Sequence, residues 1–487
     1  MKKILTIIAL TCMVFKFTSC NFLDVYPEDR LLREQVLASR SAMHNVLNGI
    51  YMNLMHNNLY GANLTQTTLE ILAQRFDLRD HNEASVWRIL QGYNFDDDAS
   101  NAMFSGIWTM MYQLILQVNY FMDLMNHTTV HFPEHHRNML MGEAYGLRAM
   151  LHFDLLRLFG PVPELATDTD SIMPYNNLVG ETELLQLLPA SAVLRNIQAD
   201  LETAASFLQS DYIISQGIVR TITFDGIANF FTNRHHRMNY YAVRALQARV
   251  FLWANMPTEA AAAARAVVNA PLVTAGTLFP WTGAESTAAG DPDRIFSSEV
   301  IFGFRNMNMY NNFRTWFLGT LHPNTLLNPN LSRLEEVFDE PGDLRFAPGL
   351  SRTWLPSPAR DGLLTSFRFA EPTSNQDTTF AYFQPLIRIS EMFLILAEVE
   401  QNPDYLQAVR SARQLFDPIA VGANLMEEIE KEYAREFWGE GQLFFFYKRR
   451  NIGQIPNANT DAEHGRNRTM LPENYRIPMP RVESDRR

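Results

Sequence analysis

Apolar residues recur at intervals of three and four through the segment "MFSGIWTMMYQLILQVNYFMDLM", and this spacing constrains the fold more than any other feature. They form one continuous stripe: Phe104, Ile107, Met111, Leu114, Val118, Phe121 and Met125. A stripe with this period predicts a long amphipathic helix with one buried face. Helices are therefore expected to dominate the first half of the chain.

Residues 138–163 carry a second helical stripe, formed by Leu140, Ala144, Leu147, Leu151, Leu155 and Leu158. This helix is predicted to end at Gly160 and Pro161, because proline cannot continue the hydrogen-bond ladder. A third helical region is predicted from Leu184 to Leu208. Pro189 suits the first turn of its main helix, where a missing N–H costs little.

Residues 240–271 have the pattern of a helical hairpin of the tetratricopeptide type. The residues that define it are Ala248, Phe251 and Ala260. Such pairs bury their apolar faces by stacking on neighbouring pairs. A degenerate second copy is predicted within residues 388–416, where Ala397 and Ala408 occupy the small-residue positions.

Residues 271–385 read differently, because they are rich in Gly, Pro, Asn, Ser and Thr and carry no long helical stripe. The short run "EVIFGFR" is predicted to be a strand. A loop-rich region of this length is usually functional or disordered, and its interleaved aromatic residues favour function. Helices are predicted to return at residues 386–416 and 425–449.

The amino terminus has the layout of a secretion signal. Two lysines precede an apolar run over residues 4–15, which is too short for a bilayer span of about 20 residues. Cleavage after Ser19 would leave Cys20 first, as in a lipoprotein whose cysteine carries acyl chains such as palmitate. Cys12, the other cysteine of the chain, leaves with the signal. Cys20 is therefore predicted to be a lipid anchor; the alternative is an ordinary secretory signal with an incidental cysteine.

Composition bounds the class of protein. The 487 residues are 47% hydrophobic and 19% charged, which is typical of a globular chain. The formal net charge of −12 argues against nucleic acid as a partner, because phosphate binding needs clustered positive charge.

One pair of carboxylates resembles a catalytic site. Glu436 and Glu440 lie four residues apart on one helix face. A glycosidase, however, needs two carboxyl groups that flank the sugar. We instead predict a structural charge network with Arg435, Lys448 and Arg449.

Two groups of histidines are weighed as metal ligands: His131, His135 and His136 with Glu134, and His235 with His236. Both lie in predicted loops, whereas a metal site needs three or four convergent ligands, so no metal is predicted. Asp96, Asp97 and Asp98 are expected to cap a helix. The sequence carries no nucleophile motif, phosphate loop or nucleotide fingerprint, so neither a cofactor nor an enzymatic activity is expected.

Aromatic residues outside the helical stripes are the candidate ligand-binding residues, because flat rings stack on the apolar faces of sugars. Those selected are Trp87, in a polar segment between helices, and Trp281, Tyr310 and Trp316, in the loop-rich region, with Trp354 in reserve. The segment 305–317 stands out because Asn306, Asn308, Asn311, Asn312 and Arg314 surround Tyr310 and Trp316. The alternative is that each ring is packed in a core, which we predict for Trp108, Trp253 and Trp438.

Six islands in order resemble the SusD/RagB family of surface nutrient-binding lipoproteins. They are "CNFLDVYPED", "EAYGLRAMLHFDLLRLFGPVP", "DEPGDLRF" with Asp343 and Arg345, "LIRISEMFLILAEVE" with Arg388, Glu391 and Glu398, "REFWGEGQLFFFYKRR" with Arg435, Glu436, Glu440 and Gly441, and "IPMPRVES". The family often has Arg and Asp where this chain has Leu443 and Phe446. The last helix therefore lacks part of the usual charge network.

The resemblance implies a mostly α fold: a helical scaffold with tetratricopeptide-like pairs and a loop-rich part that carries the ligand site. The expected division is a signal at 1–19, helical regions at 20–270 and 386–487, and a loop-rich region at 271–385. It further implies a non-enzymatic lipoprotein on the outer face of the outer membrane, which hands an oligosaccharide to a TonB-dependent, SusC-like transporter. The alternative is a peptide binder or adhesin on the same scaffold.

Overall fold

The computed structural model describes eight stretches of the chain: residues 28–180, 183–219, 230–271, 276–347, 352–358, 362–373, 379–459 and 465–487. The predicted signal and the anchor residue Cys20 lie outside the described residues.

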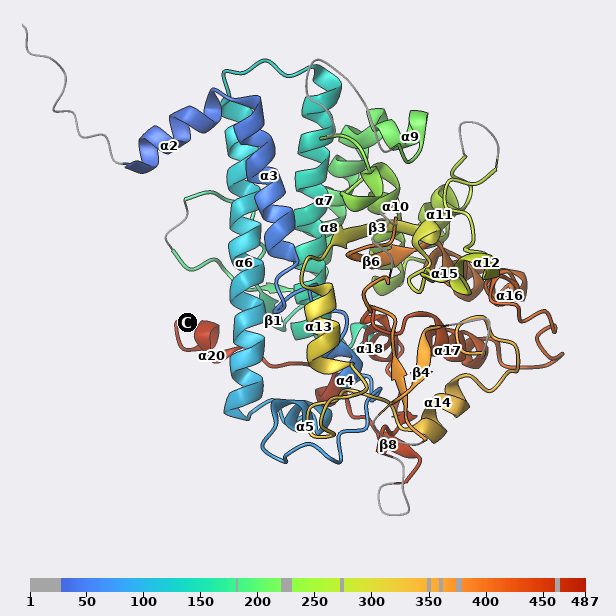
Figure 1. Cartoon of the computed structure of the whole chain (residues 1–487). Helices are drawn as coiled ribbons and strands as arrows, with labels where there is room; N and C mark the ends of the chain where they lie inside the picture. The colour runs from blue at the N-terminus through green and yellow to red at the C-terminus, as the bar shows by residue number, and fades with distance from the viewer. Residues whose placement is uncertain are drawn as a thin grey trace, which may run out of the picture.

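Three long helices form the first layer of the molecule: α3 (Arg40–Leu54), α6 (Asp98–His127) and α7 (Glu134–Phe159). They run side by side along one flank, where α6 contacts both of the others (Figure 1). With 30 residues, α6 is about 45 Å long. Each predicted apolar residue of its stripe is buried, so the expected amphipathic helix is confirmed.

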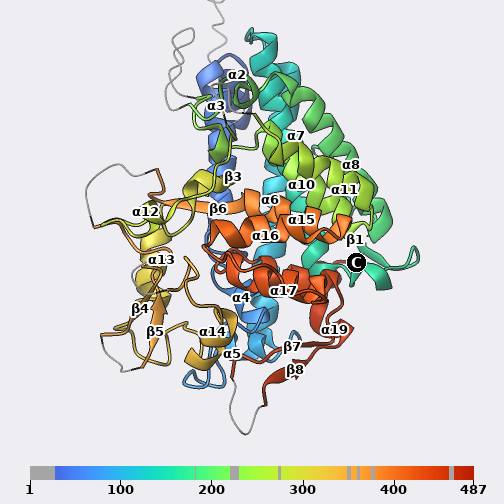
Figure 2. The same cartoon turned by 90° about the vertical axis from the view of Figure 1, so that its right-hand side faces the viewer.

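Helix pairs stack in series beside this layer. The pairs are α7 with α8 (Ala190–Phe207), α10 (Tyr240–Trp253) with α11 (Pro257–Val268), α15 (Ile389–Glu400) with α16 (Pro403–Ala412), and α17 (Leu425–Glu436) with α18 (Gln442–Arg449). Figure 2 shows the first three pairs and α17 one above another, and contacts join each pair to the next. Both predicted tetratricopeptide-like hairpins are confirmed as helix pairs.

The third predicted helix begins later than expected. Its main helix, α8, starts at Ala190, so Pro189 lies just before the first turn rather than inside it. Pro189 belongs instead to β2 (Leu188–Pro189), which pairs with β1 (Ser171–Met173). The strand pairing holds the backbone extended up to the proline.

The strands of the described residues form four small antiparallel pairs. The longest joins β3 (Val300–Arg305), the predicted "EVIFGFR" strand, to β6 (Phe383–Arg388). This pairing brings residues 300–305 of the loop-rich region beside its carboxyl-terminal end. The other strands are β4 (Trp354–Pro356) with β5 (Leu364–Ser366), and β7 (Gln454–Pro456) with β8 (Asn467–Thr469).

Short helices complete the described structure. They are α2 (Glu28–Leu37), α4 (Thr68–Leu72), α5 (Val86–Gln91), α9 (Tyr212–Gln216), α12 (Ala284–Thr287), α13 (Met309–Trp316), α14 (Leu331–Val337), α19 (Pro472–Tyr475) and α20 (Arg481–Ser484), with 3-10 turns η1 (Pro163–Leu165), η2 (Leu208–Ser210), η3 (Arg234–His236) and η4 (Ser297–Glu299). Within the described stretches, none of the helices is both long and apolar enough to span a membrane. The fold is thus mostly helical, as predicted.

Candidate functional site

Two of the selected tryptophans meet in space. Trp87 lies on α5 and Trp316 is the last residue of α13, and their rings are 6.5 Å apart at 87°. Both side chains are partly exposed. We call Trp87 and Trp316 the aromatic pair. Because the rings are perpendicular, the pair forms a corner in which one indole face and one indole edge can contact the same ligand.

Residues 309–316 form a helix, which the sequence analysis placed among loops. In α13 the buried residues Met309, Tyr310 and Phe313 share one face, so the segment has a helical period over only two turns. Asparagines at and beside this face obscured the apolar pattern. Asn311 and Arg314 are exposed, but Arg314 donates to Asn311 at 3.2 Å and is ion-paired to Glu371.

Two of the asparagines expected beside the ligand hold α13 in place instead. The amides of Asn306 and Asn312 both donate to the carbonyl of Gly61, at 3.0 and 2.8 Å. Asn312 also exchanges a pair of hydrogen bonds with Asn57, each 3.1 Å long. A side chain added at Gly61 would meet the carbonyl of Met55 at 2.2 Å, so this close approach requires glycine. These hydrogen bonds of Asn306 and Asn312 fix the direction of α13 and therefore the position of Trp316.

A polar cleft of about 470 Å³ is connected to the aromatic pair through backbone hydrogen bonds, although neither tryptophan lines it. The carbonyl of Trp316 accepts a hydrogen bond from the amide of Leu327, at 2.7 Å, and the carbonyl of Asn328 accepts one from the amide of Asp77, at 2.8 Å. These links bring two distant segments together as the walls. We call this space the polar cleft; it is lined by Asp77, Arg79, Asp80, Pro323, Asn328, Pro329, Asn330, Leu331, Gly362 and Leu363.

Tyr310 and Trp281 lie apart from the corner formed by the aromatic pair. Tyr310 is buried in a small second core, where its hydroxyl accepts a hydrogen bond from the amide of Tyr382, at 3.1 Å. Trp281 is partly buried, with its ring 5.2 Å from that of Phe393 and 5.5 Å from the guanidinium of Arg413. The structure therefore brings together only two of the four selected residues.

The remaining tryptophans are core residues. Trp354 is buried and its ring packs perpendicular to that of Trp438, at 4.9 Å. Trp108, Trp253 and Trp438 are buried in the main hydrophobic cluster, which confirms the prediction made for them.

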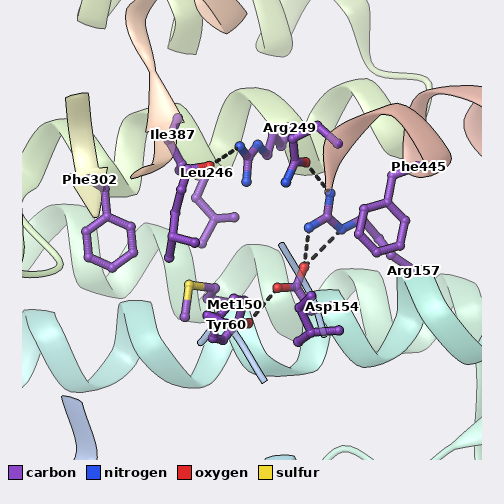
Figure 3. Close-up of a pocket in the computed structure, with 12 residues that line it drawn as sticks. Tyr60, Met150, Asp154, Arg157, Leu246, Arg249, Phe302, Ile387 and Phe445 are labelled. Atoms are coloured by element: carbon purple, nitrogen blue, oxygen red, sulfur yellow. Dashed lines mark hydrogen bonds and ion pairs between the residues drawn. The ribbon is translucent and has the colours of Figure 1, made fainter. Parts of the chain in front are cut away.

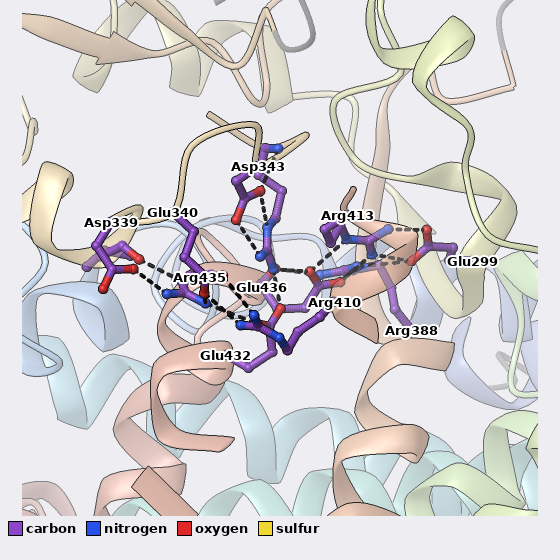
Figure 4. A network of polar contacts seen from close by, with 12 residues as sticks. Glu299, Asp339, Glu340, Asp343, Arg388, Arg410, Arg413, Glu432, Arg435 and Glu436 are labelled. Atoms are coloured by element: carbon purple, nitrogen blue, oxygen red, sulfur yellow. Dashed lines mark hydrogen bonds and ion pairs between the residues drawn. The ribbon is translucent and has the colours of Figure 1, made fainter. Parts of the chain in front are cut away.

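Five charged residues of the resemblance islands, Asp343, Arg345, Arg388, Glu436 and Glu440, meet four charged residues from other segments in the interior (part of this cluster is shown in Figure 4). We call this cluster the buried ion network; its members are Glu299, Asp343, Arg345, Arg368, Arg388, Arg413, Glu432, Glu436 and Glu440, all with less than one-tenth of their surface exposed. Glu436 contacts three arginines, among them Arg345 at 2.8 Å. Arg388 bridges Glu436 to Glu440, whose carboxylate lies 2.9 Å from its Nε. The network ties α17 to β6 and to the segment that carries Asp343.

The environment of Glu436 and Glu440 is structural rather than catalytic. Burial alone would raise the pKa of Glu436, but Arg388 and Arg413 hold it well below the usual range. Burial raises the pKa of Glu440 despite its contacts with Arg388 and Arg368. Both carboxylates are at most 1% exposed, so neither faces a space that admits a sugar. The predicted charge network is present.

Its members differ in part from those predicted. Arg435 joins the network through Glu432, at 3.5 Å, and also contacts Asp339 and Glu340, whereas Arg449 pairs with Glu398 at 2.6 Å. Lys448 donates to three carbonyls around the carboxyl end of α7, at 2.7, 3.1 and 2.7 Å. Lysine suits that position because its N–H groups can donate to the carbonyls left without partners at the end of a helix, although burial lowers the pKa of Lys448 well below its usual range.

Helix α18 packs through apolar contacts where the family often has charges. Leu443 and Phe446 are both buried, and the ring of Phe446 stacks on that of Tyr433 at 4.4 Å. An apolar pair in these positions needs no charged partner.

Two cavities beside α18 are too small for a ligand. One, of about 20 Å³, is lined by Tyr60, Asp154, Arg157 and Arg249 among others (Figure 3), and its neighbour is about 40 Å³. The hydroxyl of Tyr60 donates to Asp154 at 2.6 Å, and Arg157 donates to Gln442 at 3.1 Å. Spaces of this size and polarity admit a few water molecules, not a sugar.

A larger cleft, of about 700 Å³, lies at the ends of α10 and α15. Its one aromatic lining residue, Trp253, is only 5% exposed. It therefore offers no ring face on which a sugar could stack. The aromatic pair, whose two side chains are partly exposed, remains the better candidate for contact with a sugar ring.

The histidine groups pack against aromatic rings. His135 and His136 begin α7 rather than lying in a loop, and both contact the hydroxyl of Tyr212, at 2.9 and 3.0 Å. His236 stacks on Phe383 at 4.2 Å. Among the described residues, no three His, Cys, Asp or Glu side chains are placed to hold a metal ion. Asp97 caps α6 by accepting from the amide of Ala99, at 2.8 Å, as predicted.

Comparison with known proteins adds a match in sequence. Residues 21–218 match a family model described as "Starch-binding associating with outer membrane". A SusD-like protein, P2, from Formosa agariphila is 25% identical over 201 residues, or 41% of this chain and 37% of that protein. The chain thus matches well under half the length of this curated relative.

Solved structures share the fold over nearly the whole chain. A SusD superfamily protein from Bacteroides thetaiotaomicron has a TM-score of 0.68 at 19% identity, covering 91% of this chain and 97% of that one. A surface glycan-binding protein A from Bacteroides fluxus has a TM-score of 0.66 at 18% identity, covering 92% and 97%. At such identities the likeness is one of fold.

Proposed function

The chain belongs to the SusD/RagB family, and on this premise we propose that it binds an oligosaccharide at the cell surface and delivers it to a TonB-dependent outer-membrane transporter. The observation that carries the proposal is the aromatic pair, to which the polar cleft is connected through backbone hydrogen bonds. Sugars present apolar C–H faces and hydroxyl edges, so they need rings and planar polar groups next to one another. Trp87 and Trp316 supply the rings, and the cleft supplies carboxylates and amides.

The names of similar proteins support the same class of ligand. The relative from Bacteroides fluxus is called a surface glycan-binding protein, and a structure from Bacteroides vulgatus is called a SusD-like carbohydrate-binding protein. Binding residues concentrate where short elements are held by a rigid scaffold. Helices α5 and α13 fit this description, because both are short, α5 contacts α6, and α13 is hydrogen-bonded to the turn that follows α3.

The decisive experiment is a binding screen of residues 21–487 against an array of oligosaccharides and a peptide library. We expect binding to oligosaccharides, and at least a tenfold loss of it in Trp316→Ala. A peptide preference would favour the alternative of a peptide-binding or adhesin-like lipoprotein. Oligosaccharide binding that survives both Trp87→Ala and Trp316→Ala would place the site elsewhere.

We propose that Cys20 anchors the protein by lipid to the outer face of the outer membrane. Its place after a short apolar run supports this. Cys20→Ala is expected to release the protein from membranes or to leave the signal uncleaved. Incorporation of a fatty-acid analogue into the variant would show that the anchor lies elsewhere.

We propose a binding role without catalysis. The carboxylates that resemble an acid pair, Glu436 and Glu440, are locked in the buried ion network. A bound oligosaccharide is therefore expected to stay intact on long incubation. Cleavage products that disappear in Glu440→Gln would contradict this.

A further inference from the structure

The longest described helix, α6, carries no charged side chain over most of its length. Residues 99–122 include no Asp, Glu, Lys or Arg, whereas 19% of the whole chain is charged. Part of this stretch faces solvent, and its exposed residues include Thr109, Gln113, Leu116 and Gln117. The solvent face of a helix ordinarily carries charged and polar residues. The exposed face of α6 is therefore unlike that of a helix that is simply solvated.

Neighbouring segments continue this face on both sides. On one side, Asn53 of α3 donates to Gln117 at 3.4 Å. On the other side, the buried Asn119 donates to the carbonyl of Leu178 at 3.1 Å, so the chain that follows β1 lies along α6. We call the joint surface the uncharged flank; its members are Met52, Asn53, Gln113, Leu116, Gln117 and Leu178, all exposed.

The uncharged flank exposes large apolar side chains on three segments. Met52 is 76% exposed, and Leu116 and Leu178 are each 45% exposed. Single exposed apolar residues are ordinary on a protein surface, but adjoining ones mark places where another molecule binds. The remaining members are amides, which carry no charge and can both donate and accept hydrogen bonds.

Ion pairs border the uncharged flank toward both ends of α6. Arg33 of α2 contacts Asp123 at 2.7 Å, and Arg481 of α20 contacts Asp98 at 2.6 Å. An apolar centre, depleted of charge and surrounded by polar groups, is the anatomy of a protein–protein interface. The uncharged flank therefore has the composition of a docking surface.

The predicted lipid anchor bounds the distance between this surface and the membrane. Cys20 precedes Glu28, the first residue of α2, by eight residues, and an extended chain of that length spans at most about 29 Å. Helix α2 contacts both α3 and α6. Its ion pair with Asp123 lies seven residues, or about 10 Å, along α6 from Leu116. The anchor thus holds the uncharged flank within reach of proteins embedded in the same membrane.

Charge distinguishes among the partners that such a tether allows. A second copy of this chain would bring together two bodies with a formal net charge of −12 each, which repel one another. Helices that bind a lipid surface carry lysine and arginine on their polar face, and the uncharged flank has neither. A different membrane protein that offers an uncharged, apolar surface fits both observations.

We infer that the uncharged flank is the face by which this chain docks on the outer-membrane transporter of the proposed function. The inference rests on that function and adds the contact surface. Met52, Leu116 and Leu178 are buried at the centre of the contact, and the amides around them pair with uncharged polar groups of the transporter. The aromatic pair lies on other helices, so oligosaccharide binding does not require this contact.

The first test is a photo-crosslink in the outer membrane of the bacterium that carries this chain. In the full chain, p-benzoylphenylalanine replaces Leu116 or, as the control, Phe416, which is 72% exposed and follows α16, away from α6 (Figure 1). We expect position 116 to crosslink to a TonB-dependent transporter, identified by mass spectrometry, and position 416 not to do so. A crosslink from position 116 to this chain itself, equal crosslinks from both positions, or none from position 116 would overturn the inference.

The second test places a charge in the uncharged flank. Leu116→Glu and, independently, Met52→Glu should each reduce co-purification of the transporter at least tenfold, because the contact would bury an unpaired carboxylate. Phe416→Glu is the matched control and should have no effect. All three positions are exposed, so the urea midpoint should change little.

Oligosaccharide binding by residues 21–487 separates this inference from the proposed function. Leu116→Glu should retain the oligosaccharide affinity of the wild type. Undiminished co-purification in both flank variants would overturn the docking face and leave oligosaccharide binding standing. A wild-type chain that binds no oligosaccharide would instead overturn the proposed function.

Discussion

The buried ion network and the surface formed by the aromatic pair and the polar cleft use polar side chains in opposite ways. In the network, arginines and carboxylates are almost fully buried and have one another as partners. At the aromatic pair, rings and polar groups are partly exposed. The charged residues that made the family recognisable belong to the first region or border it. The family motifs therefore mark residues of the scaffold, while the proposed ligand site uses residues outside these motifs.

Breaking the network should have the largest effect. Arg388 contacts Glu299, Glu436 and Glu440 with no exposed surface. Removing one partner of a buried ion pair leaves uncompensated charge, so Arg388→Met is expected to lower the free energy of unfolding by about 3–5 kcal/mol. Urea denaturation measures this change.

The control for Arg388→Met is an exposed ion pair. Arg481 contacts Asp98 at 2.6 Å, with both side chains more than half exposed. Arg481→Met should cost less than about 1 kcal/mol. Similar losses in the two variants would contradict the structural role assigned to the network.

The buried carboxylate of Glu70 lies outside the network. It tests whether every buried acid of the scaffold stabilises the fold at neutral pH. Glu70 accepts from the amide of Gly441 at 2.9 Å, and Arg75 is 3.5 Å away. Burial, the largest cause, raises the pKa of Glu70 to about 7. The folded chain thus binds this proton more tightly than the unfolded chain, so stability is lost as pH rises from about 4.5 through about 7.

Glu70→Gln keeps the group neutral at every pH. Relative to wild type, the variant should gain about 3 kcal/mol of unfolding free energy between about pH 4.5 and about pH 8. Denaturation series at the two pH values check this. A difference that stays constant with pH would contradict the raised pKa.

Breaking the hydrogen bonds that hold α13 to Gly61 and Asn57 should have a smaller effect. Asn312→Ala removes hydrogen bonds to Gly61 and Asn57, with an expected loss of about 1–3 kcal/mol because their buried partners are left unsatisfied. Oligosaccharide affinity should fall as well, since Trp316 loses its fixed position. Asn311→Ala, an exposed neighbour, should leave stability unchanged. Loss of stability without loss of affinity would show that α13 does not position the ligand.

The contrast between the buried scaffold and the surface site also explains which features could be predicted from the sequence. The long helices and the helix pairs were predictable because their apolar stripes repeat with the helical period. The strand β3 was recognisable from one apolar run. These apolar patterns depend only on residues that are close in sequence, so they can be recognised without knowledge of the tertiary fold.

The candidate site was only partly predictable, because it depends on contacts between distant segments. Trp87 and Trp316 were selected separately, and nothing in their neighbourhoods indicates that they touch. The roles of Asn306 and Asn312 were wrongly interpreted, because a buried asparagine that clamps a helix looks in sequence like one that meets a ligand. The polar cleft was missed, since its walls come from segments far apart in the chain.

The most direct measurement of the central claim determines affinity and stability on the same preparations of three proteins: wild type, Trp316→Ala and Trp281→Ala. The probe is the oligosaccharide that gives the strongest array signal. A ring stacked on a ligand contributes about 1–3 kcal/mol, so Trp316→Ala should weaken binding about tenfold or more, with little change in the urea midpoint. Trp281→Ala should retain affinity, because its ring faces Phe393 and Arg413. Unchanged affinity in Trp316→Ala, together with a loss of about 3–5 kcal/mol in stability typical of a core tryptophan, would contradict the account.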